Sequence, residues 1–228
     1  IRETVESRAV RSKALISWSS GKDCAWALHV LRQRGDVHVA GLLTTINREA
    51  GRVSMHAVRE RLLEEQAAAL GLPFIKVPLP SPCSNGEYER AVREAIEMAK
   101  AQGITTIAFG DLFLEDVRRY REERMAPTGI EPIFPLWMTD TSQLAREMVT
   151  AGLRAHVTCV DPQQLDPSFA GRTFDARLLD DLPAGVDPCG EGGEFHTFVY
   201  AGPMFTEPLR VRPGPVVRRD GFVFADLM

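Results

Sequence analysis

Short apolar runs alternate with longer amphipathic runs over residues 13–110, and this alternation limits the fold more than any other feature of the chain. The short runs fit strands and the long runs fit helices. Strands are expected at 13–19, 37–46, 73–79 and 104–110, and helices at 22–34, 55–70 and 84–102. A glycine follows each helix, as is typical of helix ends. Strands that alternate with helices predict an α/β fold, in which helices cover both faces of a parallel sheet.

In a sheet of this kind, ligands bind at the carboxyl ends of the strands. Polar and small residues follow each predicted strand: they are Ser19–Asp23 after the first, Thr44 and Thr45 at the end of the second, Cys83 after the third and Asp111 after the fourth. We therefore expect these residues to share one edge of the sheet and to form a ligand site there.

The turn after the first strand, Ser17-Trp-Ser-Ser-Gly-Lys-Asp-Cys24, has the composition of an anion-binding loop. Its small residues let backbone N–H groups converge, and the helix that follows adds partial positive charge at its start. Lys22 adds a mobile positive charge. The turn lacks the spacing of a Walker A loop and of a Gly-x-Gly-x-x-Gly dinucleotide loop. An ordinary strand-to-helix turn is the alternative.

Composition narrows the class of protein. The chain has 228 residues and a net charge of −4, and its Lys and Arg form no run longer than three, which argues against a general nucleic-acid-binding surface. It contains no apolar stretch of the roughly 18 residues that a membrane helix needs. The four cysteines are scattered without a Cys-x-x-Cys pair, so neither a structural zinc site nor a secreted disulfide scaffold is expected. A reduced, cytoplasmic protein fits best.

Proline recurs after residue 130 and breaks the chain into short segments. One helix is expected at 141–151, with Asp140 as its cap, and the rest predicts short strands and loops. We therefore expect two domains, the α/β domain at 1–130 and a smaller α+β domain at 131–228.

A second polar segment, residues 187–198, places Glu191, Glu194 and His196 close together among three glycines. We call it the glycine-rich segment. Alternation along the strand that follows would put Glu194, His196 and Phe198 on one face. Carboxylates and imidazole can bind Mg²⁺, orient an amine or move protons. A polar hairpin with solvated charges is the alternative.

The first turn resembles the Ser-Gly-Gly-x-Asp-Ser loop of the ATP pyrophosphatases, which split ATP between its α and β phosphates. Ser20 stands in place of the first glycine and Cys24 in place of the final serine. Together with Gly110-Asp111, then Arg118 and Arg121, and then Gly190-Glu-Gly-Gly-Glu-Phe-His-Thr197, the order of motifs resembles the diphthine–ammonia ligase family of ATP pyrophosphatases. The resemblance covers about residues 13–200, and Arg52–His56 resembles its bacterial branch.

This resemblance implies a first domain with an adenine-nucleotide α-hydrolase-like sheet that binds ATP and Mg²⁺, and a second domain that carries part of the acceptor site. It implies that ATP adenylates a carboxylate, that pyrophosphate leaves, and that ammonia then displaces AMP to form an amide. The acceptor is either a protein or a small metabolite.

Roles follow by position. Ser17, Ser19, Ser20, Gly21 and Lys22 are expected to hold the phosphates, with Lys22 neutralising the pyrophosphate. Asp23 is expected to orient Mg²⁺ or the loop itself, although a plain charge at a helix start is the alternative. Thr44 and Thr45 are expected to border the adenosine, and Asp111 to bind Mg²⁺ or the acceptor.

The remaining predicted site residues belong to the acceptor side. Arg118 and Arg121 lie on one helical face and are expected to grip a phosphate or a carboxylate, with a solvated basic face as the alternative. Glu191, Glu194 and His196 are the expected set for handling the acceptor or ammonia. Cys83, Gly192 and Gly193 are expected to contact the substrate.

Two other functions compete with the ligase. One is a tRNA-modifying ATP pyrophosphatase, which the acidic charge and the unpaired cysteines disfavour. The other is a non-catalytic adenine-nucleotide sensor, which the glycine-rich segment disfavours. The apolar tail at 222–224 allows either a homodimer contact or a final strand packed on the body.

Overall fold

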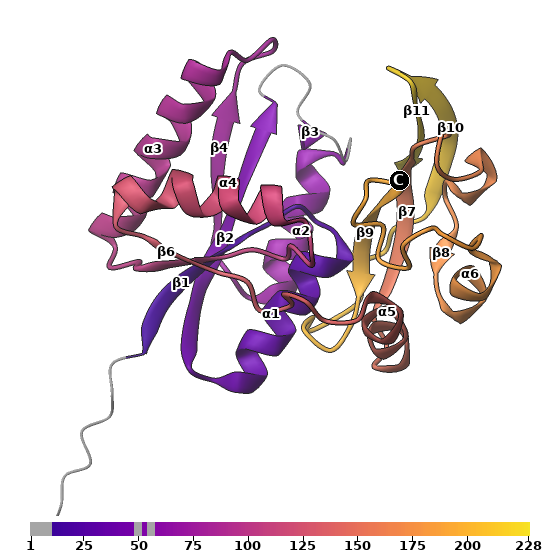
Figure 1. Cartoon of the computed structure of the whole chain (residues 1–228), viewed down its shortest axis with the longest axis horizontal. Coiled ribbons are helices and arrows are strands. Elements are labelled where there is room, and N and C mark those ends of the chain that lie inside the picture. Colours follow the sequence, from indigo (N-terminus) through magenta and orange to yellow (C-terminus); the bar gives the residue numbers. More distant parts are fainter. Residues whose placement is uncertain (1–10, 48–51, 54–57) are drawn as a thin grey trace, which may run out of the picture.

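The computed structural model describes residues 11–47, 52–53 and 58–228. Its elements form two sheets, one from each half of the chain, with helices α1 (Lys22–Arg34) and α2 (Glu60–Leu70) between them (Figure 1).

The first sheet has six strands, and all but one pair of neighbours in it are parallel. The strands are β1 (Ser12–Ser17), β2 (Val37–Asn47), β3 (Arg52–Val53), β4 (Phe74–Leu79), β5 (Thr106–Ala108) and β6 (Glu131–Ile133). The parallel strands lie in the order β4-β2-β1-β5-β6, and the short β3 runs antiparallel to β2. The order reverses between β1 and β5, which is where such sheets bind ligands.

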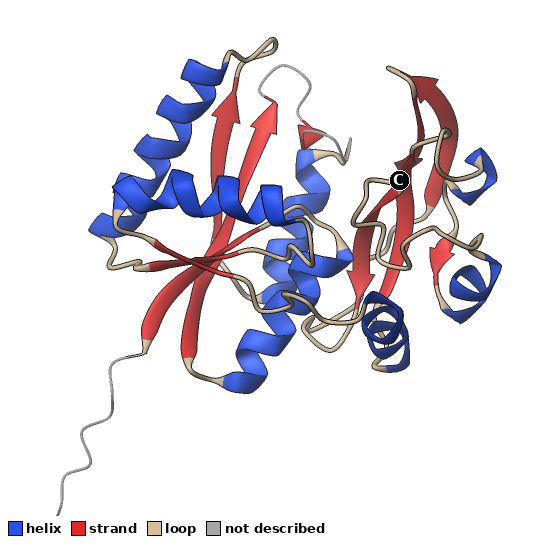
Figure 2. Ribbon diagram, viewed as in Figure 1, coloured by secondary structure: helices blue, strands red, loops and turns tan. Residues whose placement is uncertain are grey.

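Helices cover both faces of this sheet (Figure 2). On one face, α1 and α2 pack in one hydrophobic cluster, and on the other face α3 (Asn85–Ala101) and α4 (Glu115–Met125) contribute to separate clusters. A short 3₁₀ helix, η1 (Ala126–Thr128), follows α4. The predicted α/β fold class is confirmed.

Three local predictions differ from the structure. The second helix begins at Glu60 rather than at residue 55; part of the Arg52–His56 motif and residues 54–57 lie outside the described residues. The helix α6 (Ala176–Asp181) lies where only short strands and loops were expected, and the three-residue strand β6, which contains Pro132, was not predicted for the first sheet. Proline is tolerated there because β6 is the last strand of the sheet and does not need that N–H.

The second sheet is antiparallel. Its elements are α5 (Thr141–Thr150), β7 (Arg154–Val160), η2 (Pro167–Phe169), β8 (Thr173–Phe174), α6 (Ala176–Asp181), β9 (Phe195–Ala201), β10 (Pro213–Arg219) and β11 (Phe222–Leu227). β7 lies in the middle and pairs with β8, β9 and β11. This α+β arrangement agrees with the predicted fold class. The apolar tail forms β11, with Val223 buried, so a final strand on the body accounts for it.

One continuous hydrophobic cluster joins the two sheets. It includes Leu28 of α1, Leu62 of α2 and Phe198 of β9, so the helices between the sheets bury apolar side chains against both. The predicted division into domains 1–130 and 131–228 stays a prediction, and any boundary would have to follow β6, which belongs to the first sheet. None of the helices in the described residues is long and apolar enough to cross a membrane.

Candidate active site

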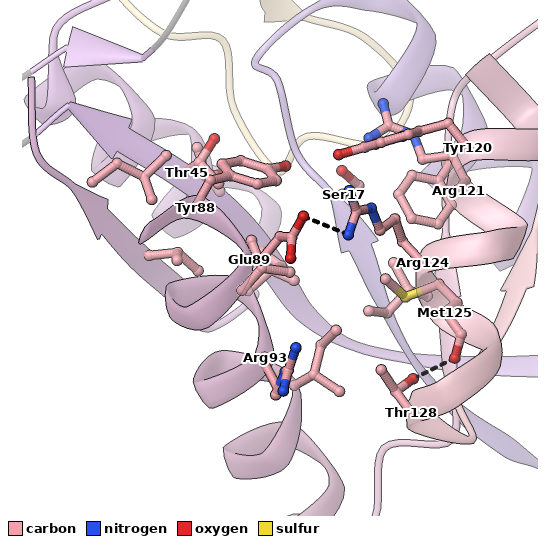
Figure 3. A pocket seen from close by; sticks show the side chains of 18 of the residues that line it. Ser17, Thr45, Tyr88, Glu89, Arg93, Tyr120, Arg121, Arg124, Met125 and Thr128 are labelled. Carbon is pink, nitrogen blue, oxygen red and sulfur yellow. Dashed lines mark hydrogen bonds and ion pairs between the residues drawn. The ribbon is translucent and has the colours of Figure 1, made fainter. Parts of the chain in front are cut away.

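A cavity of about 870 Å³ opens between α3 and α4 beside the carboxyl ends of the parallel strands (Figure 3). Its walls come from β1, β2, β4, β5, α3 and α4, and one residue of β9 reaches it. Of the predicted site residues, the cavity brings together Ser17, Ser19, Thr44, Thr45, Cys83, Arg121 and His196. The loop at residues 18–21, which we call the phosphate loop after its predicted role, and the glycine-rich segment therefore meet in one space.

The loop between β1 and α1, residues 18–21, is fixed at both ends. The Trp18 N–H donates to the Leu43 carbonyl at 2.8 Å, and the Thr44 hydroxyl donates to the Trp18 carbonyl at 2.6 Å. At the other end, the Val199 N–H of β9 donates to the Ser20 carbonyl at 2.9 Å. Thr44 is therefore a wall residue that also holds the loop.

The loop leads directly into the start of α1. Gly21 is the N-cap of that helix and supplies no side-chain cap, so N–H groups of the first turn need partners from outside the helix. One of them, the Lys22 N–H, donates to the Thr197 hydroxyl at 3.1 Å. A Cβ on Gly21 would lie 3.3 Å from the Thr197 carbonyl oxygen, so the glycine allows β9 to approach closely.

Lys22 is buried between the two halves of the chain and does not line the cavity. Its Nζ donates to Asp23 Oδ2 at 2.9 Å and to the Cys189 carbonyl, and it lies 5.6 and 5.4 Å from the ring centres of Phe174 and Phe195. Burial alone would lower the pKa of Lys22, but the nearby acidic groups, with Asp23 foremost, raise it. Lys22 therefore carries a positive charge behind the loop.

Three carboxylates gather beside the start of α1. Glu191 Oε1 accepts a hydrogen bond from the Leu112 N–H at 2.7 Å, and Asp111 Oδ2 accepts one from Arg121 Nε at 3.2 Å. Burial, together with the charges of Asp23 and Asp111, raises the pKa of Glu191 to about 7. Burial also raises the pKa of Asp23, which the Lys22 charge opposes.

Gly110 brings the end of β5 against the start of α1. A Cβ at this position would lie 2.8 Å from the Asp23 carbonyl carbon and 2.8 Å from the Cys24 nitrogen, closer than such atoms approach. Only glycine therefore lets Asp111 come so near to Asp23. Within the described residues, no group of three or more His, Cys, Asp or Glu side chains is placed to hold a metal ion.

The glycine-rich segment folds back on itself. The Asp187 N–H donates to Glu194 Oε1 at 3.0 Å, and the Glu191 N–H donates to Asp187 Oδ2 at 2.8 Å. Gly190 has a φ of 67°, and a Cβ there would meet the Phe195 carbonyl oxygen at 2.7 Å. Glu194 is buried inside this turn, with Gly192 against its carboxylate. Gly192 itself is exposed, and Gly193 is half-buried.

His196 lines the cavity, whereas Glu194 does not. Glu194 precedes β9, which begins at Phe195, so the alternation expected for Glu194, His196 and Phe198 starts one residue before the strand. Burial, with a smaller effect of the Lys22 charge, lowers the pKa of His196 to about 4. Its imidazole is therefore neutral at physiological pH, and the same burial opposes its protonation.

The two arginines of α4 separate. Arg121 lines the cavity and its guanidinium carbon lies 4.7 Å from the centre of the Phe109 ring. Arg118 instead forms an ion pair with Glu122 and lies 4.8 Å from the centre of the Phe134 ring. The two side chains therefore do not converge on one ligand in this structure.

Several residues of the cavity wall and around the loop were not predicted from the sequence. Glu89 of α3 and Arg124 of α4 form an ion pair of 2.6 Å across the cavity, with the side chains of Tyr88 and Tyr120 beside it (Figure 3). Gln66 of α2 lies fully buried beneath the phosphate loop. A signal existed for Gln66, because it is a polar residue four positions after Leu62 on the apolar face of its helix.

Two descriptions of known domains match the chain in tandem. Residues 12–131 match the diphthamide synthase N-terminal domain, and residues 140–221 match the diphthamide synthase C-terminal domain. The phosphate loop and Asp111 fall in the first match, and the glycine-rich segment falls in the second.

Individual relatives agree with this match. The chain is 32% identical over 150 residues to the diphthine–ammonia ligase of Homo sapiens, which covers 63% of this chain and 55% of that protein. It is 29% identical over 155 residues to the enzyme of Bos taurus, covering 65% and 57%. With the enzyme of Danio rerio it shares 27% over 175 residues, covering 70% and 68%. The chain thus spans little more than half the length of the human and bovine relatives.

Proposed function

The chain belongs to the diphthamide synthase family, and on that premise we propose that it is an ATP-dependent ligase that joins ammonia to a carboxylate, as its relatives named diphthine–ammonia ligase do. A carboxylate oxygen of the acceptor attacks the α-phosphorus of ATP and pyrophosphate leaves. Ammonia then attacks the carbonyl carbon, the C–O bond to AMP breaks, and the nitrogen loses one proton. The products are an amide, AMP and pyrophosphate.

One observation carries the proposal: the phosphate loop and His196 of β9 line the same cavity. Adenylation requires the acceptor carboxylate and the α-phosphate to meet, and amidation requires the nitrogen to lose a proton at the same place. The imidazole of His196 and the guanidinium of Arg121 stand in the wall of this cavity, where both steps would take place.

The phosphates are assigned to the loop. The loop from Ser19 to Gly21 leads into the start of α1, and helix starts favour anions. To bind a phosphate, the N–H groups of Gly21 and Lys22 would exchange the hydroxyls of Ser19 and Thr197 for phosphate oxygens. Ser17 lies at the end of β1 beside them, and Thr44 and Thr45 form the neighbouring wall for the adenosine. Lys22 acts from behind the loop, where its buried charge favours negative charge that develops on pyrophosphate.

Magnesium is assigned to Asp23 and Asp111. Mg²⁺ commonly binds one or two carboxylates together with substrate phosphates and water, so a group of three protein ligands is not needed. The residues fit, because Asp23 Oδ1 is buried and has no hydrogen-bond partner among the described residues. Bound there with ATP, Mg²⁺ would neutralise phosphate charge.

The acceptor side is assigned to Arg121 and His196. Arg121 offers its guanidinium to the acceptor carboxylate, a pairing that guanidinium geometry favours. The neutral imidazole of His196 accepts the proton that the nitrogen loses. Glu191 and Glu194 shape the glycine-rich segment through their hydrogen bonds to Leu112 and Asp187.

Contacts of the substrate with the other predicted residues are still predictions. Cys83 is exposed at the cavity, and Gly192 and Gly193 lie in the turn beside Glu194. Arg118 would have to leave Glu122 to reach a ligand. We further propose that the protein is a cytoplasmic enzyme whose acceptor is a protein or a small metabolite. Its oligomeric state, a monomer or a homodimer, is a matter for measurement in solution.

The test uses the purified chain with Mg²⁺ and ATP labelled at the α-phosphate, with and without ammonium and a panel of carboxylates. Label that appears in AMP, in an amount that rises with one acceptor and with ammonium, supports the ligase and identifies the acceptor class. Label in ADP contradicts it. Tight ATP binding without AMP under any acceptor favours a nucleotide sensor, and acceptance of tRNA as the substrate favours a tRNA-modifying enzyme.

A further inference from the structure

We propose that Gln66 is a positioning residue that holds the phosphate loop in its anion-binding shape and couples that loop to β9. The part that concerns nucleotide affinity rests on the proposed function. The part that concerns the shape of the loop rests on geometry alone.

The side-chain amide of Gln66 reaches three separate groups. Its Oε1 accepts a hydrogen bond from the indole Nε1–H of Trp18 at 2.9 Å. Its Nε2 donates to the Ser20 carbonyl at 3.1 Å and to the Val199 carbonyl at 2.6 Å. Both N–H groups of the amide are therefore used. Two of the three partners flank Ser19 in the loop, and the third belongs to β9.

These contacts act on a strained residue. Ser20 has a φ of 74°, a conformation that side chains other than glycine rarely adopt. Such a conformation persists only where the surroundings impose it. The Ser20 carbonyl accepts from both Gln66 Nε2 and the Val199 N–H, so two donors fix the direction of one peptide plane.

The direction of that plane decides where the loop offers its next donor. In a trans peptide the C=O and N–H groups point opposite ways. The Ser20 carbonyl points toward Gln66 and β9, so the Gly21 N–H points away from them, toward the Ser19 hydroxyl at 3.4 Å. Ser19 lines the cavity. Gln66 therefore fixes the direction of a loop N–H that donates to Ser19, a residue of the cavity wall.

Packing alone does not call for an amide at this position. Gln66 is fully buried and lies in the apolar face of α2, where a polar group costs free energy unless all its hydrogen bonds are made. An apolar side chain would fill the space, but it would leave the Trp18 indole N–H and the Val199 carbonyl without this partner. The amide makes three directional hydrogen bonds, and these bonds link Trp18, Ser20 and Val199 to one another.

The first experiment measures amide hydrogen exchange in the free protein, with no nucleotide present. In the variants Gln66→Met and Gln66→Glu, which both remove the two donors, exchange should quicken about tenfold in peptides covering residues 17–24 and 197–200, and little elsewhere. Thr106→Val is the matched control, since it also removes a buried polar group, in β5. Unchanged exchange in the loop, or an equal increase along the whole chain, would overturn the proposal.

The second experiment titrates the same variants with Mg²⁺ and an ATP analogue that carries an α,β-methylene bridge. Gln66→Met should raise Kd about tenfold, and adding Ser20→Gly should recover part of the loss, because glycine adopts the required φ without support. Because Ser20→Gly also stabilises the fold, Gly86→Ala is added to Gln66→Met as the matched control; it should stabilise by a similar amount without touching the loop. Recovery with Ser20→Gly but not with Gly86→Ala supports positioning, and no recovery, or equal recovery with both, counts against it. If the unaltered protein binds no nucleotide, the proposed function fails, and the exchange experiment still decides the role of Gln66.

Discussion

The carboxylate of Glu191 accepts a hydrogen bond from the backbone N–H of Leu112 at 2.7 Å and thereby joins the glycine-rich segment to the residue after Asp111. This contact brings the second half of the chain to the carboxyl end of β5. It also buries a carboxylate beside Asp23 and Asp111, and the pKa of Glu191 rises to about 7.

Glu191→Gln should therefore stabilise the protein in a pH-dependent way. The pKa is about 4.5 when the side chain is unperturbed and about 7 in the fold, so ionisation opposes folding; the penalty is absent below pH 4.5 and complete above pH 7. The amide keeps the acceptor for Leu112 but carries no charge. Thermal unfolding should show Tm raised by about 2–4 °C at pH 8 and little changed at pH 5. Glu65→Gln, at an exposed pair, is the control. An equal shift at both pH values would contradict this account.

Ser20→Gly should stabilise the nucleotide-free protein. The backbone of Ser20 is held at a φ of 74°, and its buried hydroxyl has no partner among the described residues. Glycine removes both penalties, so the free energy of unfolding should rise by about 1 kcal/mol. Denaturant unfolding measures the change. Ser19→Gly is the control and should destabilise slightly, because Ser19 donates to Cys24 Sγ and gains no relief of strain. A loss of stability in Ser20→Gly would show that the strain is not there.

Lys22→Met should destabilise the fold, in addition to any loss of activity. It leaves the largely buried carboxylate of Asp23 without its cation, which should cost about 3 kcal/mol. The double variant Lys22→Met with Asp23→Asn should recover much of this, because the unpaired charge is gone. Lys76→Met, which removes a half-exposed cation paired with Glu60 and Glu64, should change stability far less. Additive effects of the Lys22 and Asp23 substitutions in denaturant unfolding would refute the coupling.

The behaviour of Lys22 shows what the sequence could and could not predict. Local signals were sufficient for α1, whose bounds agree with the expected 22–34, and for α3, which was expected at 84–102 and spans Asn85–Ala101. Asp140 likewise caps α5 as expected. These features depend on residues only a few positions apart, so they can be predicted from the sequence.

Contacts between segments that are far apart in the chain could not be predicted in this way. The loop pattern predicted that Lys22 would face a phosphate, but its Nζ is bound to the carbonyl of Cys189, on the glycine-rich segment of the other half. Gln66 was not predicted as a site residue, because its partners Trp18 and Val199 lie 48 and 133 residues away in the chain. The motifs indicated which residues gather at the sheet edge, while their partners depended on how the second sheet packs against α1 and α2.

Gly110→Ala should weaken the contact between β5 and the start of α1. The new Cβ would lie 2.8 Å from backbone atoms of Asp23 and Cys24, which cannot rotate away as a side chain can. The free energy of unfolding should fall by about 2 kcal/mol. Gly86→Ala is the matched control: it lies in α3 with open space around its Cβ, so it should stabilise by about 0.5–1 kcal/mol. Equal effects of the two substitutions in denaturant unfolding would exclude a steric role for Gly110.

Arg121→Ala and Arg118→Ala should differ although both residues lie on α4. Arg121 lines the cavity beside Asp111, so its loss should lower kcat/KM for AMP formation by about a hundredfold, as expected when a charged contact to a reacting substrate is removed. Arg118 pairs with Glu122 and packs on Phe134 and Trp137 away from the cavity wall, so its loss should lower stability with a small effect on kcat/KM. Steady-state assays of AMP release, together with thermal unfolding of each variant, separate the two effects. A larger loss of kcat/KM in Arg118→Ala than in Arg121→Ala would reverse the assignment and place the acceptor carboxylate at Arg118.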